Sequence, residues 1–513
     1  MRRTCAAQRP AAMPILFEIY RDGQRLAHFT PVNAVAVGPE SVPIPGEVKF
    51  ENGLLSLNLT EEHAVAVSLL WEVAGQGVYH METTRLQPRP QPYNLNVELA
   101  RCRLMKIVQK QEDWNLFDFP RADQYALMFR QAQEAFSDAL GRLHEPGEAA
   151  KLADRSLSLA VDLSEQLANF HGELLLNRRR ANGAIPRHVF GCRVDSTIQN
   201  QRYKDTLTDQ FDFAVLPMSW RQLQPEEDTF VTEPVDEWVE QLSRKRVPII
   251  AGPLVDLSDG GMPDWSFIWE HDFDTLRELA YEFVQKVVHR YRKAVSIWNV
   301  VAGLHTSNHF TLTFEQIIEL TRLLVAQVKT LIPSAQTLVT ITQPYGEYHA
   351  RGHTSVPPML YADMVAQAGV NFDGFGLELE TGVPRMGSYT RDLFQFSSLL
   401  DRFSTMNRRV YITAISAPDR NQADPSDKSE GTLNPAAAGR WRRPWDPNLQ
   451  AEWMHAVYHV ALSKPFVESI AWGDLADINP SIPGGGLLDD MLKPKPAFRK
   501  LQELREQFHR FRK

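Results

Sequence analysis

Two glutamates two residues apart, at the end of an apolar run, have the spacing for acid–base chemistry. Phe372–Leu379 is a predicted strand, and Glu378 and Glu380 lie at its end. Because side chains alternate between the two faces of a strand, both carboxyl groups point to the same side. Two acids in one site should raise the pKa of one of them and share a proton. Such a pair can transfer protons or bind a cation.

Aspartates follow several other apolar runs in the second half of the chain: Asp195, Asp256, Asp259 and Asp474. Asp256 is the one that we consider as a partner for either glutamate in a catalytic pair. The alternative is that all these acids are polar residues at the rim of a site, bonded to neighbouring groups or to the hydroxyl groups of a ligand. Both interpretations place a ligand near them.

Metal and cofactor sites are not predicted. His349 and His353 have the i, i+4 spacing of a metal pair, but Gly352 and nearby prolines favour a loop, and no third ligand stands out. The three cysteines lie far apart without a CxxC pair, which argues against a zinc site and a disulfide framework and suits a reducing compartment.

Eight short apolar runs alternate with amphipathic segments over the last ~320 residues, the pattern of a (β/α)8 barrel. The predicted strands are Val189–Val194, Phe211–Leu216, Val247–Gly252, Val295–Val301, Thr337–Thr342, Phe372–Leu379, Arg409–Ile415 and Glu468–Trp472. In such a barrel the residues just past each strand form the active face, which is where the acids fall.

The first part of the chain has another pattern. Period-two alternation predicts a β-rich, sandwich-like domain, which is either a sugar-binding module or a packing domain without a ligand. Two helical stripes then predict a helical hairpin, and Arg178–Arg180 at its end are expected to be a solvated helix terminus. The expected boundaries are 1–13 for an extension, 14–118 for the β-rich domain, 119–183 for the hairpin and 184–508 for the barrel.

Bulk composition describes an ordinary globular protein of 513 residues, with 43% hydrophobic and 23% charged residues. The net charge of -8 gives no electrostatic reason to expect nucleic acid or an anionic membrane. No run reaches the ~20 apolar residues of a membrane helix, and no signal-peptide core follows the first twelve residues. We therefore expect a cytoplasmic protein, with secretion not excluded and either Met1 or Met13 as its start.

Several motifs in the barrel region resemble glycoside hydrolase family 10, the xylanase family, in the right order and at plausible spacing. Trp298–Val301 is similar to the family's Trp-Asp-Val-Val-Asn-Glu strand, and Phe372–Glu378 to its Asp-Gly-Ile-Gly-x-Gln strand. Met218–Trp220 resembles the family's Met-Lys-Trp segment, and Gln224–Glu226 resembles its Glu-Pro segment. Near the end of the chain, Tyr411–Ala414 resembles Ile-Thr-Glu, Ala471–Gly473 resembles Val-Trp-Gly, and Leu487–Ala497 resembles the closing segment of the family. The resemblance implies a barrel that acts on xylan-type saccharides.

The resemblance also assigns the two catalytic glutamates of the family, and here both are missing. The acid/base position falls on Gly303 and the nucleophile position on Ala414. Other family positions also differ in this chain. Ser219 stands where the family has the lysine of Met-Lys-Trp, and the positions of the strand-three histidines fall near Gly252 and Leu257. Glu378 and Glu380 replace the Gln and His that follow strand six in the family. Losing both glutamates should remove the family mechanism almost completely.

The residues that we expect to contact a saccharide are Trp220, Trp298, Trp472, Asn299, Glu378 and Glu380. Indole rings can stack on sugars, although core packing is the commoner role of a single tryptophan, and Trp472 is the one that the resemblance places in a cleft. Three functions remain open: a non-catalytic saccharide-binding barrel, an active glycosidase with relocated carboxylates, and a protein-interaction scaffold without a sugar. The two lost glutamates favour the first over the second.

Overall fold

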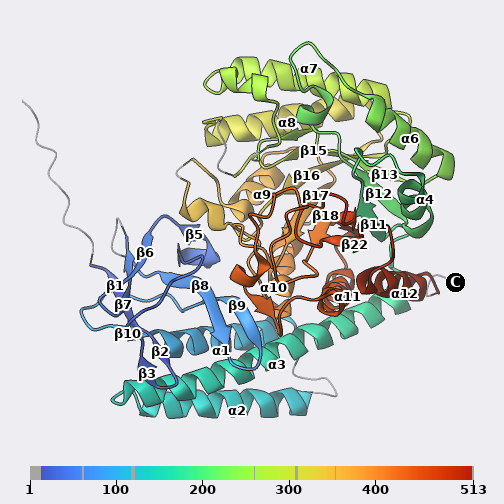
Figure 1. Cartoon of the computed structure of the whole chain (residues 1–513). Coiled ribbons are helices and arrows are strands. Elements are labelled where there is room, and N and C mark those ends of the chain that lie inside the picture. The colour runs from blue at the N-terminus through green and yellow to red at the C-terminus, as the bar shows by residue number, and fades with distance from the viewer. Residues whose placement is uncertain are drawn as a thin grey trace, which may run out of the picture. The chain divides into compact units, whose positions relative to one another are not determined.

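A computed structural model describes residues 13–59, 63–116, 122–258, 260–306, 310–352 and 354–510 (Figure 1). Of the expected extension, these ranges include only Met13. Asp259 and His353 also lie outside the described residues. The chain divides into two compact units. The first holds the residues up to Gln76 and His80–Ser164, and the second holds Gly77–Tyr79 and the residues from Glu165 onward.

The first unit is rich in β-structure, as predicted. One sheet has the order β10-β1-β7-β6, and β8 pairs with β4, which pairs with β5. The strands are β1 (Ile15–Glu18), β2 (Tyr20–Arg21), β3 (Gln24–Arg25), β4 (Val35–Val37), β5 (Pro43–Ile44), β6 (Glu47–Glu51), β7 (Leu54–Asn58), β8 (Ala66–Val73), the second half of β9 (Gly77–Glu82) and β10 (Tyr93–Asn94). Asn52 and Gly53 both have positive φ, the conformation of a tight hairpin turn between β6 and β7.

Three long helices follow: α1 (Leu95–Asp113), α2 (Ala122–Gly141) and α3 (Pro146–Ala181). The predicted stripe of α2 is buried at Tyr125 and Ala132. Ser156 Oγ of α3 donates a hydrogen bond of 2.7 Å to the carbonyl oxygen of Ala132, which joins the two helices. The predicted helical hairpin is therefore present.

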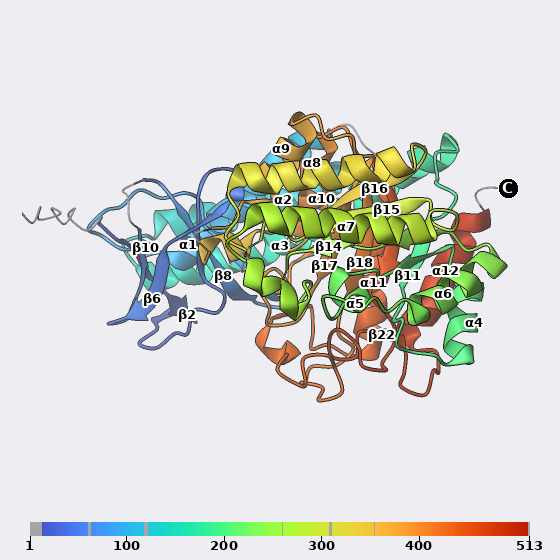
Figure 2. The ribbon, with the colours of Figure 1, turned by 90° about the horizontal axis from the view of Figure 1, so that it is seen from above.

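The second unit contains a closed parallel barrel, and all eight predicted strands are confirmed (Figures 1 and 2). Around the barrel they are β11 (Phe190–Arg193), β12 (Phe213–Leu216), β13 (Ile249–Ala251), β15 (Ile297–Ala302), β16 (Gln336–Ile341), β17 (Gly374–Glu380), β18 (Arg409–Ser416) and β20 (Val467–Trp472). Pairing of β13 with β15 and of β20 with β11 closes the ring.

Helices cover the outside of the barrel, and Figure 2 shows α7 and α8 lying along it. They are α4 (Gln201–Gln210), α6 (Glu233–Lys245), α7 (Phe273–Tyr291), α8 (Phe314–Leu331), α9 (Pro358–Gln367), α10 (Leu393–Ser404), α11 (Pro447–Ser463) and α12 (Pro496–Arg510). Short elements at the strand ends are α5 (Trp220–Leu223), β14 (Val255–Asp256), β19 (Arg440–Trp441), β21 (Asp474–Ala476) and β22 (Gly486–Leu488). No helix within the described ranges is long and apolar enough to cross a membrane.

The barrel interior changes from apolar to polar along the strands. A cluster of buried side chains that includes Phe213, Leu338 and Tyr411 fills its core. Farther along, Thr340 Oγ1 donates to Asn299 Oδ1 at 2.8 Å, and a Cβ added to Gly376 would meet Thr340 Oγ1. Small or polar residues therefore follow the apolar core toward the carboxyl ends of the strands, the active face of such a barrel.

The expectation for Arg178–Arg180 was wrong at its middle residue. Arg179 is 5% exposed and donates to four backbone carbonyl groups, those of Ala184, Leu462, Lys464 and Val467, at 2.8–3.0 Å. Its planar guanidinium binds carbonyl groups on both sides of the turn before β20, so this arginine joins α3 to the chain entering the last strand. Arg178, by contrast, is exposed.

We predict that Arg179→Met lowers the free energy of unfolding by about 3 kcal/mol, because four buried carbonyl groups lose a charged donor. Arg178→Met is the matched control and should cost less than about 0.5 kcal/mol. Urea denaturation of both variants measures the difference, and equal losses would show that the buried guanidinium adds no stability.

Candidate functional site

Gly303 stands directly after β15 and has no room for a side chain. Its φ is +66°, a conformation that residues with a Cβ adopt at a cost. A Cβ built on it would lie 2.7 Å from the amide nitrogen of Ser258 and 2.8 Å from Oδ1 of Asp256. The segment after β13 thus occupies the space in which a side chain at position 303 would begin.

Asp256 belongs to that segment. It lies in β14, where it pairs with Ala302, one residue before Gly303. Its Oδ1 accepts hydrogen bonds from the amide nitrogen of Ser258 at 2.9 Å and from Ser258 Oγ at 2.5 Å. Burial raises the pKa of Asp256, and the two bonds from Ser258 oppose that rise. A carboxyl group of a neighbouring strand therefore stands beside the glycine.

Glu378 stands beside Ala414, the position at which the resemblance predicts the second catalytic glutamate. A register irregularity after Leu377 makes Glu378 the direct partner of Ala414 across β17 and β18. Glu378 is half-buried and forms no hydrogen bond or ion pair with any residue that the structure describes. Each of the two positions that lack a carboxylate therefore has one on the adjacent strand.

Asp256 affects the ionisation of Glu378. Burial raises the pKa of Glu378 to about 7, with a further rise from the negative charges of Asp256 and Glu380 and a partial opposing effect of Arg193. A rise was expected for one member of a crowded acid pair. At neutral pH the site thus contains a carboxyl group that is about half protonated.

Glu380 differs from Glu378 because it has a counter-ion. Its Oε2 lies 2.8 Å from Nη1 of Arg385 and accepts a hydrogen bond of 3.4 Å from Ser388 Oγ. Arg193, at the end of β11, donates to the carbonyl oxygen of Gly473 at 2.9 Å and to Ser481 Oγ at 2.7 Å. Of the two predicted glutamates, only Glu378 is left with its carboxylate unpaired.

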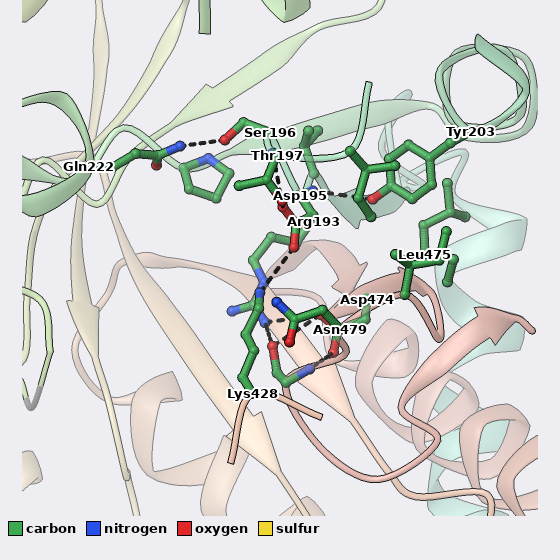
Figure 3. A pocket seen from close by; sticks show the side chains of 16 residues that line it. Arg193, Asp195, Ser196, Thr197, Tyr203, Gln222, Lys428, Asp474, Leu475 and Asn479 are labelled. Carbon is green, nitrogen blue, oxygen red and sulfur yellow. Dashed lines mark hydrogen bonds and ion pairs between the residues drawn. The ribbon is translucent and has the colours of Figure 1, made fainter. Parts of the chain in front are cut away.

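A pocket of about 340 Å³ opens beside Arg193, between the loops after β11 and β20 (Figure 3). Lys428 lies 3.1 Å from Asp195 across it, and Gln222 Nε2 donates to Ser196 Oγ. The remaining lining residues mix hydroxyl, amide and small apolar groups: Val194, Thr197, Ile198, Tyr203, Pro217, Asp474, Leu475, Ala476, Ile478, Asn479 and Ser481. Such a lining suits a small polar ligand.

The three tryptophans expected at the ligand have no exposed ring face. Trp220, Trp298 and Trp472 are all 0% exposed. The Trp220 ring stacks on Phe283 with centroids 5.3 Å apart, and Trp472 Nε1 donates to the carbonyl oxygen of Gly485 at 2.7 Å. Packing against helices and loops takes the surface that a sugar ring would need.

Asn299 is also completely buried, but it faces the barrel interior. Its Oδ1 accepts from Thr340, whereas its Nδ2 has no hydrogen-bond partner among the described residues. Gly376 lies next to Thr340, and Glu378 follows Gly376 by two residues on the same strand face. The free amide group thus lies one layer below Glu378.

The sequence did not single out Arg193, Ser258, Gln222 or Lys428. Arg193 ends an otherwise apolar run, which is a usable signal for a charge at a barrel mouth. Lys428 lies in the long loop 421–439, which was expected as a lid or an insertion, and it is the residue of this loop that lines the pocket. His349 bonds to Ser355 Oγ, and the described residues contain no group of three potential metal ligands.

Comparison with known proteins identifies relatives of the barrel. The sequence model of a family described as Glycosyl hydrolase family 10 matches residues 181–504. Endo-1,4-beta-xylanase B of Thermotoga neapolitana is 22% identical over 306 residues, which are 56% of this chain and 79% of that protein.

Solved structures of xylanases are also similar. Native xylanase 10B from Thermotoga maritima has a TM-score of 0.48 at 17% identity and covers 65% of this chain and 99% of its own. Xylanase 10B from Thermotoga petrophila RKU-1, in complex with xylobiose, has a TM-score of 0.48 at 17% identity, with coverage of 64% and 97%.

We predict that Gly303→Ala destabilises the protein by roughly 1–3 kcal/mol more than Gly369→Ala does. Both glycines have a similar positive φ, +66° and +72°, but a Cβ on Gly369 would meet nothing within 4 Å. The comparison therefore isolates the crowding by Asp256 and Ser258 from backbone strain. Chemical denaturation measures both losses, and equal values would mean that the β14 segment moves aside freely.

We predict that Glu378→Gln changes how stability depends on pH. The folded pKa of about 7 lies above the ordinary value of 4.5, so the folded wild type binds more protons than the unfolded chain between these values. Its stability should therefore fall as pH rises from 4.5 to 7, and the glutamine variant should lack this fall. Melting temperatures across pH 4–8 test this, and parallel curves would contradict the raised pKa.

Proposed function

Because the chain belongs to glycosyl hydrolase family 10, we propose that its barrel binds a saccharide at the carboxyl ends of the strands and does not hydrolyse it by the two-glutamate mechanism. Xylan-type oligo- or polysaccharides are the first candidates, since the structure of a similar protein, xylanase 10B from Thermotoga petrophila RKU-1, contains xylobiose. The observation that carries the proposal is the filled space beside Gly303.

A retaining glycosidase needs two carboxyl groups about 5–5.5 Å apart, one as acid/base and one as nucleophile. Gly303 and Ala414 supply neither, and a side chain at position 303 would overlap Asp256 and Ser258. General acid catalysis contributes roughly 10²–10⁴-fold and a nucleophile on the order of 10⁶-fold. A barrel without both groups should have almost no turnover by that route.

Saccharide binding does not need those two groups. The pocket beside Arg193 has a volume of about 340 Å³, within the range of pockets that hold small ligands. Its hydroxyl, amide and charged groups can each donate to or accept from the hydroxyl groups of a sugar. Lys428 and Asp195 form an ion pair there, so their polar atoms are held in place at the wall of the pocket.

A second candidate function, hydrolysis by relocated carboxylates, is favoured by one observation. Asp256 lies against Gly303 and Glu378 lies opposite Ala414, so an acid stands beside each vacated position. A proton shared between them would leave one acid and one carboxylate, the pair that glycoside hydrolysis requires. In this alternative Glu380 stays bound to Arg385 and takes no part.

We predict that xylotriose binds the purified protein and that aryl β-xylosides are not turned over. Lys428→Ala should weaken binding about tenfold because it removes a polar group from the pocket wall. Lys293→Ala, at the opposite end of the barrel before β15, is the control with the same charge change and should have no effect. Calorimetry and a chromogenic assay measure the two properties.

Two outcomes would contradict the proposal. Turnover that disappears in Glu378→Gln and Asp256→Asn would support the second candidate function. Binding that is absent for every saccharide on a glycan array would instead favour the protein-interaction scaffold.

A further inference from the structure

We infer that the barrel mouth recognises the ammonium group of an amino sugar through the carboxylates of Glu378 and Asp256. The inference rests on the proposed saccharide binding and narrows its ligand class. A glucosamine-type unit would place its cationic amino group between the two acids. A neutral xylose unit offers only hydroxyl groups there.

The charges around the two acids leave a place for a cation. Three basic side chains at the mouth already have an acid of their own. Arg385 binds Glu380, Lys428 binds Asp195, and Arg193 lies 3.7 Å from Asp474. The buried thiol of Cys192 also lies near Arg193, and its raised pKa keeps it uncharged. The charge of Arg193 also acts on Glu378 and opposes part of the rise in its pKa, but no basic nitrogen of the described residues lies within ion-pair distance of Glu378 or Asp256.

A buried donor provides a second, independent sign of a polar ligand. Asn299 is 0% exposed, and its Nδ2 has no partner among the described residues. It lies one layer below Glu378 on the inner face of the barrel. A buried amide without a partner is unfavourable, and a sugar hydroxyl or a water beneath the sugar can accept its hydrogen bond. A sugar with an ammonium group could pair with the two carboxylates and also accept the hydrogen bond of the Asn299 amide.

The direction of the pH dependence follows from the same charges. A bound ammonium group favours the ionised form of Glu378, so binding lowers the pKa of Glu378 from about 7 and releases a proton. Since the ionised form is the competent one, affinity should rise about tenfold between pH 5.5 and 7. Asp256 and Arg193 on neighbouring strands and Glu380 on the same strand are the groups whose charges act on the pKa of Glu378.

Calorimetry with three trisaccharides tests the inference. The probes are glucosamine trisaccharide, its fully N-acetylated form and xylotriose, each at pH 5.5 and 7. We expect the glucosamine trisaccharide to bind at least tenfold more tightly than the other two at pH 7, and Glu378→Gln to remove this preference. Glu468→Gln is the matched control, because it removes one negative charge at the start of β20, at the other end of the barrel.

The outcomes separate this inference from the proposed function. A preference lost in Glu378→Gln and kept in Glu468→Gln supports the ammonium site. Equal binding of all three probes overturns the inference and leaves saccharide binding intact, and binding of none overturns both. A preference that persists in Glu378→Gln also overturns it, because the net charge of -8 would then attract the cationic sugar without a specific site.

Discussion

The close approach of the β14 segment to Gly303 is the constraint on which the mouth of this barrel depends. Asp256 can lie there only because position 303 has no Cβ and adopts a positive φ. That contact brings the Asp256 carboxyl group close enough to raise the pKa of Glu378. The missing side chain thus determines both the shape of the mouth and its charge.

Two charged side chains, Arg179 and Glu378, differ in how far their charge is compensated by hydrogen bonds. Arg179 is buried with a full set of acceptors, four backbone carbonyl groups, and such a charge can stabilise the fold. Glu378 is half-buried without any partner among the described residues, and such a group is unfavourable when ionised. The first arrangement serves the structure of α3 and β20. The second has a cost that binding of a cationic or proton-donating ligand would offset.

Much of the fold could be predicted from local patterns. Apolar runs such as Phe372–Leu379 located the barrel strands, and motif order identified the family. The shared face of Glu378 and Glu380 followed from the alternation of side chains in a strand. The role of Arg179 could not be predicted, because its acceptors lie in the chain near Lys464, almost 300 residues away.

The contacts of the site residues could not be predicted either, because they also depend on residues in other strands and loops. The irregularity that sets Glu378 opposite Ala414 is a property of two paired strands, and neither strand encodes it alone. The buried indole of Trp472 donates its hydrogen bond to Gly485, which belongs to the loop that follows β21 and not to the strand itself.

Gly303 and Ala414 differ in whether their backbone conformation accepts a larger side chain. Ala414 lies in β18 next to a register irregularity, but its φ is not positive, so its backbone conformation accepts a side chain. Gly303 does not, because its φ and the atoms of Asp256 and Ser258 both oppose a side chain. A larger side chain at position 303 would need a new course for the β14 segment. A substitution at Gly303 alone is therefore unfavourable, and the acids next to positions 303 and 414 are Asp256 and Glu378 on the adjacent strands.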